Sequence, residues 1–232
     1  MEPITKKESE EFYSNVWLER QKKTGVNARH HSIYNKAISL GLKPEHSVLE
    51  IGCGIGALSS LLIPYLERGG NLFSCDLSIE SIKLAQETYK QYTNCEFHAL
   101  DGSDFILDRQ FDMVIMPDSC EHIPIEHHNR MFKNISKMLK RDCVLYIHIP
   151  HPYHLDWMRV HTPADLQIID QSLYLDDFCE SIKDTDLYVF SEEPYNVWTY
   201  PNEVEWRGKY IHRVLRKKFY IPKQFRYSHS LF

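Results

Sequence analysis

The chain has 232 residues, of which 43% are hydrophobic and 25% charged, with a formal net charge of −5. These values are ordinary for a globular protein with one main core. No apolar run approaches the roughly 20 residues of a membrane span, and the first residues lack the apolar core of a signal peptide. Six cysteines stand singly without a CxxC spacing, which excludes a zinc knuckle or a disulfide framework. We therefore expect a reduced, cytoplasmic protein.

Short apolar runs alternate with helical segments from residue 47 onwards. The predicted strands are 47–52, 71–77, 95–100, 111–116 and 143–149, and the predicted helices between them are 57–68, 78–92 and 128–141. Alternation of this kind is typical of a parallel sheet that helices cover on both faces. Two further strands, 186–193 and 209–217, are expected to close the sheet as a hairpin.

Three segments fall outside this alternation. Residues 1–45 have helical character and precede a main domain that spans residues 46–232. Residues 150–183 form an insert rich in histidine and aromatic residues, and residues 206–232 hold the last strand and a basic tail. Ligands of open α/β sheets bind at the carboxyl ends of the strands, where we expect the helical segment and the insert to lie.

A glycine-rich turn, VLEIGCGIGALS, joins the first strand to the first helix at residues 48–59. Gly52, Gly54 and Ala57 satisfy the dinucleotide-binding pattern, and Asp76 follows about twenty residues later as that pattern requires. Glu50, however, would repel a pyrophosphate, whereas it suits a ligand that carries an ammonium group. The turn therefore favours a different cofactor.

The spacing ExGxGxG resembles motif I of the class I S-adenosylmethionine (SAM)-dependent methyltransferases, and the resemblance covers about residues 45–150. It implies a Rossmann-like, doubly wound, seven-stranded sheet, mostly parallel with an antiparallel C-terminal strand, and N-terminal lid helices. It also implies SAM as the cofactor. The implied cofactor-binding residues are Glu50, Gly52, Gly54 and Gly56 in the turn, Asp76 and Leu77 at the ribose, Asp101 and Gly102 at the adenine, and Arg29 of the lid at the carboxylate.

Each acidic residue in that set also has a local interpretation. Glu50 could cap the turn, Asp76 could cap a helix, and Asp101 could belong to a turn before Gly102. Taken together, these interpretations would leave three strand-end carboxylates converging on one crevice without a purpose. The binding interpretation is therefore preferred.

The stretch PDSCEHIP, residues 117–124, places Asp118, Glu121 and His122 at the end of the fourth strand. Methyl transfer to a hydroxyl requires removal of its proton, and imidazole is a suitable base near neutral pH. We therefore predict His122, Asp118 and His151 as catalytic residues, with the alternative that His122 only caps the next helix.

The same stretch resembles the ExxEH pattern of metal-dependent O-methyltransferases of small-RNA 3′ ends and of the ubiquinone pathway. The resemblance implies that Asp118, Glu121 and His122 hold Mg²⁺ or Mn²⁺, with a fourth ligand from the histidines of residues 148–161. Asp118 stands where the pattern has glutamate, so the match is partial.

The function predicted is SAM-dependent methyl transfer to a hydroxyl of a polar small molecule, a saccharide or polyol. One alternative is an RNA 2′-O-methyltransferase, for which the basic and aromatic residues 207–226 would be the anchor. A second is a non-catalytic SAM-binding protein. The acidic body of the chain disfavours nucleic acid, no membrane partner is expected, and a homodimer is left open.

Overall fold

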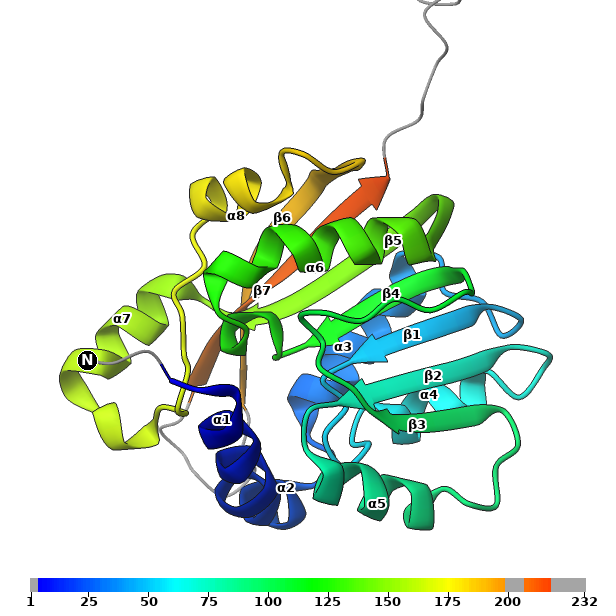
Figure 1. Ribbon diagram of the computed structural model, residues 1–232, viewed down its shortest axis with the longest axis horizontal. Helices are drawn as coiled ribbons and strands as arrows, with labels where there is room; N and C mark the ends of the chain where they lie inside the picture. The colour runs from blue at the N-terminus through cyan, green and yellow to red at the C-terminus, as the bar shows by residue number, and fades with distance from the viewer. Residues whose placement is uncertain (1–3, 199–206, 218–232) are drawn as a thin grey trace, which may run out of the picture.

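The computed structural model describes residues 4–198 and 207–217. The predicted basic tail beyond residue 217 lies outside these ranges. The described residues form a seven-stranded sheet with the order β3-β2-β1-β4-β5-β7-β6. Only β7 runs antiparallel to its neighbours, so the predicted doubly wound, mostly parallel sheet is confirmed (Figure 1).

Five parallel strands form the centre and one side of the sheet. They are β1 (Ser47–Ile51), β2 (Asn71–Asp76), β3 (Cys95–Ala99), β4 (Phe111–Pro117) and β5 (Leu139–Pro150). The strand order reverses direction at β1, which pairs with β2 on one side and β4 on the other. The carboxyl ends of β1 and β4 therefore flank the crevice at which such sheets bind ligands.

The hairpin that closes the sheet consists of β6 (Leu187–Trp198) and β7 (Arg207–Lys217). β7 inserts between β5 and β6, so β6 is the edge strand and runs parallel to β5. Both predicted strands exist and extend further than the apolar runs that predicted them.

Helices cover both faces of the sheet (Figure 1). Their bounds are α3 (Ala28–Ser39), α4 (Ser59–Tyr65) and α5 (Ile79–Thr88) on one face, and α6 (Ile125–Met138) and α8 (Leu175–Ile182) on the other. Strand side chains alternate between the two layers: Leu49 and Ile51 join the core under α6, whereas Val48 joins the core under α4. Glu50, next in that alternation, points to the α4 side.

One predicted helix has the expected length but begins and ends three residues earlier, as α6 (Ile125–Met138). The helix expected over residues 128–141 ends at Met138, and β5 begins at Leu139. Leu139 pairs in register with Phe111, and the Lys140 ammonium lies 2.8 Å from the Asp112 carboxylate of β4. These contacts with β4 hold the segment as strand although its sequence continues a helical pattern.

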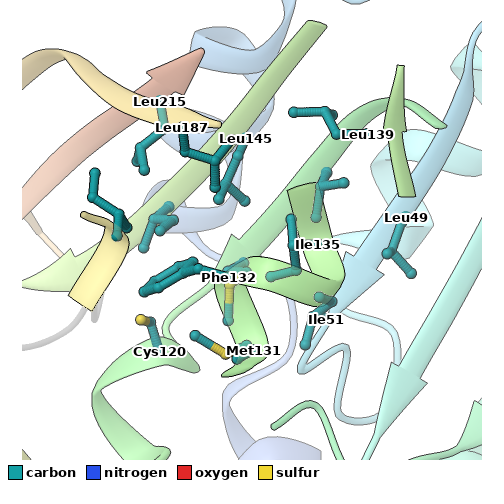
Figure 2. Packing of buried hydrophobic residues seen from close by; sticks show 14 of the residues in the cluster. Leu49, Ile51, Cys120, Met131, Phe132, Ile135, Leu139, Leu145, Leu187 and Leu215 are labelled. Atoms are coloured by element: carbon teal, nitrogen blue, oxygen red, sulfur yellow. The ribbon is translucent and has the colours of Figure 1, made fainter. Parts of the chain in front are cut away.

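Phe132 lies at the centre of the core beneath α6 (Figure 2). Its ring is fully buried and meets Phe178 edge-on at a centroid distance of 5.1 Å. We expect Phe132→Ala to lower the free energy of unfolding by about 3–5 kcal/mol, since it removes a ring and leaves a cavity. Urea unfolding of this variant beside Lys133→Ala, an exposed neighbour, checks the value. Equal stability of the two variants would contradict the packing described.

Two groups of helices lie at the carboxyl ends of the strands. The first is α1 (Lys6–Phe12), the π-helix η1 (Tyr13–Trp17) and α2 (Leu18–Thr24); the second is α7 (Pro152–His161) with the 3-10 helix η3 (Pro163–Asp165). Figure 1 shows α1 and α2 facing the ends of β1 and β2. We call residues 4–24 the lid. No helix in the described part of the chain is both long and apolar enough to cross a membrane.

Candidate active site

A cavity of about 250 Å³ opens at the carboxyl ends of β1, β2 and β4, beneath the lid. Its polar lining from the sheet side comprises Glu50, Asp76, Asp101, Asp118, Ser119 and His122, and its lining from the N-terminal helices includes Lys6, Tyr13, Trp17, Gln21 and Arg29. The structure therefore brings the predicted strand-end residues to one place.

Glu50 is fully buried in the wall of this cavity. Its Oε2 accepts hydrogen bonds from the hydroxyls of Ser59 at 2.6 Å and Ser74 at 2.8 Å. Within the described residues, Oε1 has no partner. Burial raises the pKa of Glu50 to about 7, although the two serine hydroxyls oppose the shift. The carboxyl group is thus fixed through one oxygen, and the other oxygen is buried without a partner among the described residues.

Gly52 lets the end of β1 approach the end of β4. It has a φ of +85°, and a Cβ at this position would lie 2.3 Å from Cβ of Ser119. The side chains of Gln21 and Tyr89 lie against Gly54 and Gly56, which are not among the residues that line the cavity. Contact of these two glycines with the cofactor stays a prediction.

Asp76 ends β2 with its carboxylate on the cavity. The backbone N–H of Gly54 donates to Oδ2 at 2.8 Å, and that of Ser78 donates to Oδ1 at 2.9 Å. A carboxylate offers about four lone-pair sites, so both oxygens can accept further hydrogen bonds. Burial raises the pKa of Asp76, against these N–H donors. Leu77 lines the cavity beside it.

Asp101 and Gly102 line the same cavity after β3, and the lid reaches across to them. Ser103 donates to Oδ1 of Asp101 through its backbone N–H at 3.0 Å and its hydroxyl at 2.7 Å. The Lys6 ammonium lies 2.9 Å from Oδ2 of Asp101. Asp101 is therefore oriented by Ser103 and covered by the first residue of α1.

Asp118 occupies the left-handed region with a φ of +48°, directly after β4. His148 Nδ1–H donates to its Oδ1 at 2.6 Å, and the Arg29 guanidinium lies 3.3 Å from its Oδ2. Burial opposes ionisation, but Arg29 and His148 hold the pKa of Asp118 well below its usual range. Asp118 is therefore a carboxylate on the cavity wall that is paired with Arg29 and His148, and its catalytic role stays a prediction. Arg29 lines the cavity as predicted, but its charge is paired with this carboxylate.

His122 lies on the cavity in the short helix η2 (Cys120–His122). Its Nδ1–H donates to the carbonyl oxygen of Ile169 at 2.6 Å and lies 3.2 Å from Oδ1 of Asp170. Its Nε2 lies 3.6 Å from Oε1 of the buried Glu121. Burial disfavours the charged imidazole, but Glu121 and Asp170 outweigh it and raise the pKa of His122 to about 9. The sequence predicted titration near neutrality, so the neighbouring carboxyl groups change that expectation.

The predicted metal ligands are not arranged as a metal site. Asp118 is directed to Arg29 and His148, while Glu121 and His122 lie beside each other and Asp170. Within residues 4–198 and 207–217, no three histidine, cysteine, aspartate or glutamate side chains could hold one metal ion.

His151 is not among the residues that line the cavity, so its catalytic role stays a prediction. It is the N-cap residue of α7 and makes no side-chain capping hydrogen bond; its imidazole stacks on the Tyr153 ring at a centroid distance of 5.5 Å.

Sequence reasoning missed one group beside His122. Asp170 belongs to an irregular segment with no periodic pattern, so nothing in the sequence marked it. Tyr13 of the lid also lies near His122, with its ring at a centroid distance of 6.0 Å. Its hydroxyl is buried and has no hydrogen-bond partner in the part of the chain that is described.

Comparison with known proteins agrees with this geometry. Residues 48–142 match the family described as a methyltransferase domain. This match contains the glycine-rich turn, Asp76, Asp101 and the Asp118–His122 segment. No curated protein matches the sequence.

Solved structures share the fold at low sequence identity. A SAM-dependent methyltransferase from Clostridium acetobutylicum superposes with a TM-score of 0.65 at 17% identity, covering 89% of this chain and 98% of its own. Magnesium protoporphyrin IX methyltransferase from Synechocystis with bound S-adenosylhomocysteine (SAH) gives 0.66 at 18%, covering 91% and 99%. An N-methyltransferase from Bradyrhizobium japonicum with SAH gives 0.64 at 16%, covering 88% and 98%.

The match over residues 48–142 and the shared fold agree with the fold expected of a class I SAM-dependent methyltransferase. Two of the solved structures that share this fold hold SAH. The residues present fit such a group: Asp76 and Asp101 offer carboxylate oxygens to hydroxyl and amino groups, and Oε1 of Glu50 is a buried acceptor without a partner among the described residues.

Proposed function

We propose that the protein transfers the methyl group of SAM to a hydroxyl of a polar small molecule, a saccharide or polyol. One observation carries this proposal: a histidine with two carboxyl neighbours lies on the cavity wall immediately after β4. A hydroxyl is a poor nucleophile while protonated, so O-methylation benefits from a base at this position more than amine methylation does.

SAM, when bound, supplies an activated methyl group. The chain's own residues would bind and orient the cofactor and the acceptor, and one of them would accept the proton. Asp76 and Asp101 would hold the hydroxyl and amino groups of the cofactor, and the lid would exclude water through Lys6 and Tyr13. As the acceptor oxygen forms its bond to the methyl carbon, the bond between that carbon and the sulfonium sulfur breaks and SAH is left. The proton of the hydroxyl would pass to Nε2 of His122, and Asp170 would stabilise the resulting imidazolium.

Apart from His122, further charged and polar residues of the cavity lining favour a polar acceptor. Arg29 and Asp118 form a fixed ion pair on the wall, and Glu126 and His127 at the start of α6 complete this side of the cavity. Charged groups held by other protein groups keep their geometry, and they can accept or donate hydrogen bonds to several hydroxyls of one ligand.

The basic residues near the C-terminus give less support to an RNA acceptor than their number suggests. Arg213 is fully buried and binds Glu192, with its Nε 2.7 Å from the carboxylate. Lys217 donates to the carbonyl oxygens of Ser136 and Leu139 at 2.6 and 3.0 Å. These two cations stabilise the hairpin and the end of α6 rather than forming a surface for phosphates.

Transfer of a labelled methyl group from SAM to a panel of polyols, saccharides, amines and short RNA tests the proposal. We expect label in a hydroxyl acceptor, with one SAH released per methyl group, and loss of that transfer in His122→Ala. Transfer confined to amines, at equal rates in the wild type and His122→Ala, would contradict it. Binding of SAH without transfer to any class would support the non-catalytic alternative.

A further inference from the structure

The segment of residues 166–174, between η3 and α8, is fixed against η2 and the start of α6. One residue, Gln171, supplies most of the hydrogen bonds that attach the segment. Its backbone N–H donates to the carbonyl of Glu121 at 3.0 Å, its amide nitrogen donates to the carbonyl of Ile123 at 2.5 Å, and its Oε1 accepts from the N–H of Ile125 at 3.0 Å. The residues just before Gln171 are therefore held at a defined distance from His122.

Asp170 is itself held through both its side chain and its backbone carbonyl. Its Oδ2 accepts the backbone N–H of Gln167 at 2.6 Å, and its carbonyl accepts a hydrogen bond from Arg159 of α7. Its remaining oxygen, Oδ1, lies 3.2 Å from Nδ1 of His122, and the side chain is 8% exposed. The carboxylate therefore reaches His122 already oriented by its own segment.

We infer that Asp170 is the positioning residue of His122, and that Ile169 and Asp170 together keep the proton of neutral His122 on Nδ1. The lone pair of a neutral imidazole then lies on Nε2, the nitrogen that faces away from this segment. A carboxylate or carbonyl on one ring nitrogen selects the tautomer in this way and stabilises the imidazolium that forms when the other nitrogen takes a proton. The inference deepens the proposed function and rests on it for the role of Nε2, but the tautomer itself does not depend on methyl transfer.

Other elements also face the imidazole. Glu121 precedes it in η2 and lies 3.6 Å from Nε2; Tyr13 of the lid brings its ring to 6.0 Å; and Asp76 of β2 is close enough for His122 to lower its pKa, against burial. Glu121 and Asp76 remain in every variant below, so a change in His122 can be assigned to Asp170.

Nitrogen NMR of histidine-labelled full-length protein tests the inference without substrate. The His122 signals are assigned by their loss in His122→Gln. In the wild type above pH 9, we expect the shifts of an imidazole protonated on Nδ1. In Asp170→Asn, which keeps the size of the side chain, we expect the titration midpoint of His122 to fall by about one pH unit or more, because a nearby opposite charge is removed.

Two variants control for the charge and for the segment. Asp170→Glu restores the charge and should return the midpoint toward the wild-type value. Asp165→Asn changes an exposed carboxylate of η3 and should leave the midpoint unchanged. A neutral wild-type imidazole protonated on Nε2, or equal midpoints in wild type and Asp170→Asn, would overturn the inference.

The pH profile of methyl transfer separates this inference from the proposed function. If His122 is the base, the rising limb of the rate moves to lower pH in Asp170→Asn together with the NMR midpoint. If the NMR midpoint moves and the rate profile does not, Asp170 positions His122 but the proposed role of His122 as base is wrong.

Discussion

Asp76→Ala is expected to weaken SAH binding about 10- to 100-fold, which corresponds to the loss of hydrogen bonds to a charged group. The carboxylate lies on the cavity that we propose as the cofactor site, and both its oxygens can accept hydrogen bonds beyond those from the N–H groups of Gly54 and Ser78. Isothermal titration calorimetry with SAH measures the change directly.

The same titration with two further variants separates binding from folding. Asp76→Asn keeps one acceptor oxygen for the turn and should show an intermediate loss. Asp108→Ala removes an exposed carboxylate after β3 and should bind SAH as the wild type does. Wild-type affinity in Asp76→Ala would show that the cavity side of β2 is not the cofactor site.

His122→Ala is expected to lower turnover about 10²- to 10⁴-fold, the usual contribution of a general base, while SAH affinity changes little. The reason is that His122 lies on the cavity without holding the strand-end carboxylates Asp76 and Asp101, which have their own partners. Steady-state kinetics with the hydroxyl acceptor, beside calorimetry with SAH, measures both. An unchanged turnover would leave His122 only its structural contacts with Ile169 and Asp170.

The pH dependence of the wild type follows from the same residue. Asp170 and Glu121 outweigh burial and raise the pKa of His122 from its ordinary value of 6.5 to about 9. A base works only when unprotonated, so turnover should rise with pH until about 9 and then level off. The free energy of unfolding changes with pH in the opposite direction to turnover. The protonated imidazole stabilises the folded state fully below about pH 6.5, and this contribution is lost as the pH rises through about 9. A rate profile that levels off near 6.5 would contradict the contacts with Asp170 and Glu121.

The sheet could be predicted because short apolar runs alternate along the chain with segments of helical spacing. Strand ends follow from strand positions, so Glu50, Asp76 and Asp101 could be placed at one edge before any coordinates were known. The end of α6 could not be predicted from the sequence, because Leu139 and Lys140 become strand only through their contacts with Phe111 and Asp112 of β4.

The chemistry of the site depended on partners that are distant in the sequence. Asp118 looked like a metal ligand or an acid beside His122, yet its partners come from α3 and β5, and they leave it a paired anion. His122 looked like an ordinary imidazole, yet its neighbour Glu121 and, 48 residues further along the chain, Asp170 together raise its pKa against burial. Local spacing carries no information about such contacts, because the turn geometry of an irregular segment decides them.

A crystal structure of the protein with SAH would test the central claim most directly. We predict the ribose hydroxyls within hydrogen-bond distance of Asp76, the adenine beside Asp101 and Gly102, and the sulfur on the side of the cavity that holds His122. SAH bound elsewhere, or with its sulfur remote from His122, would contradict both the proposed base and the assignment of this cavity as the active site.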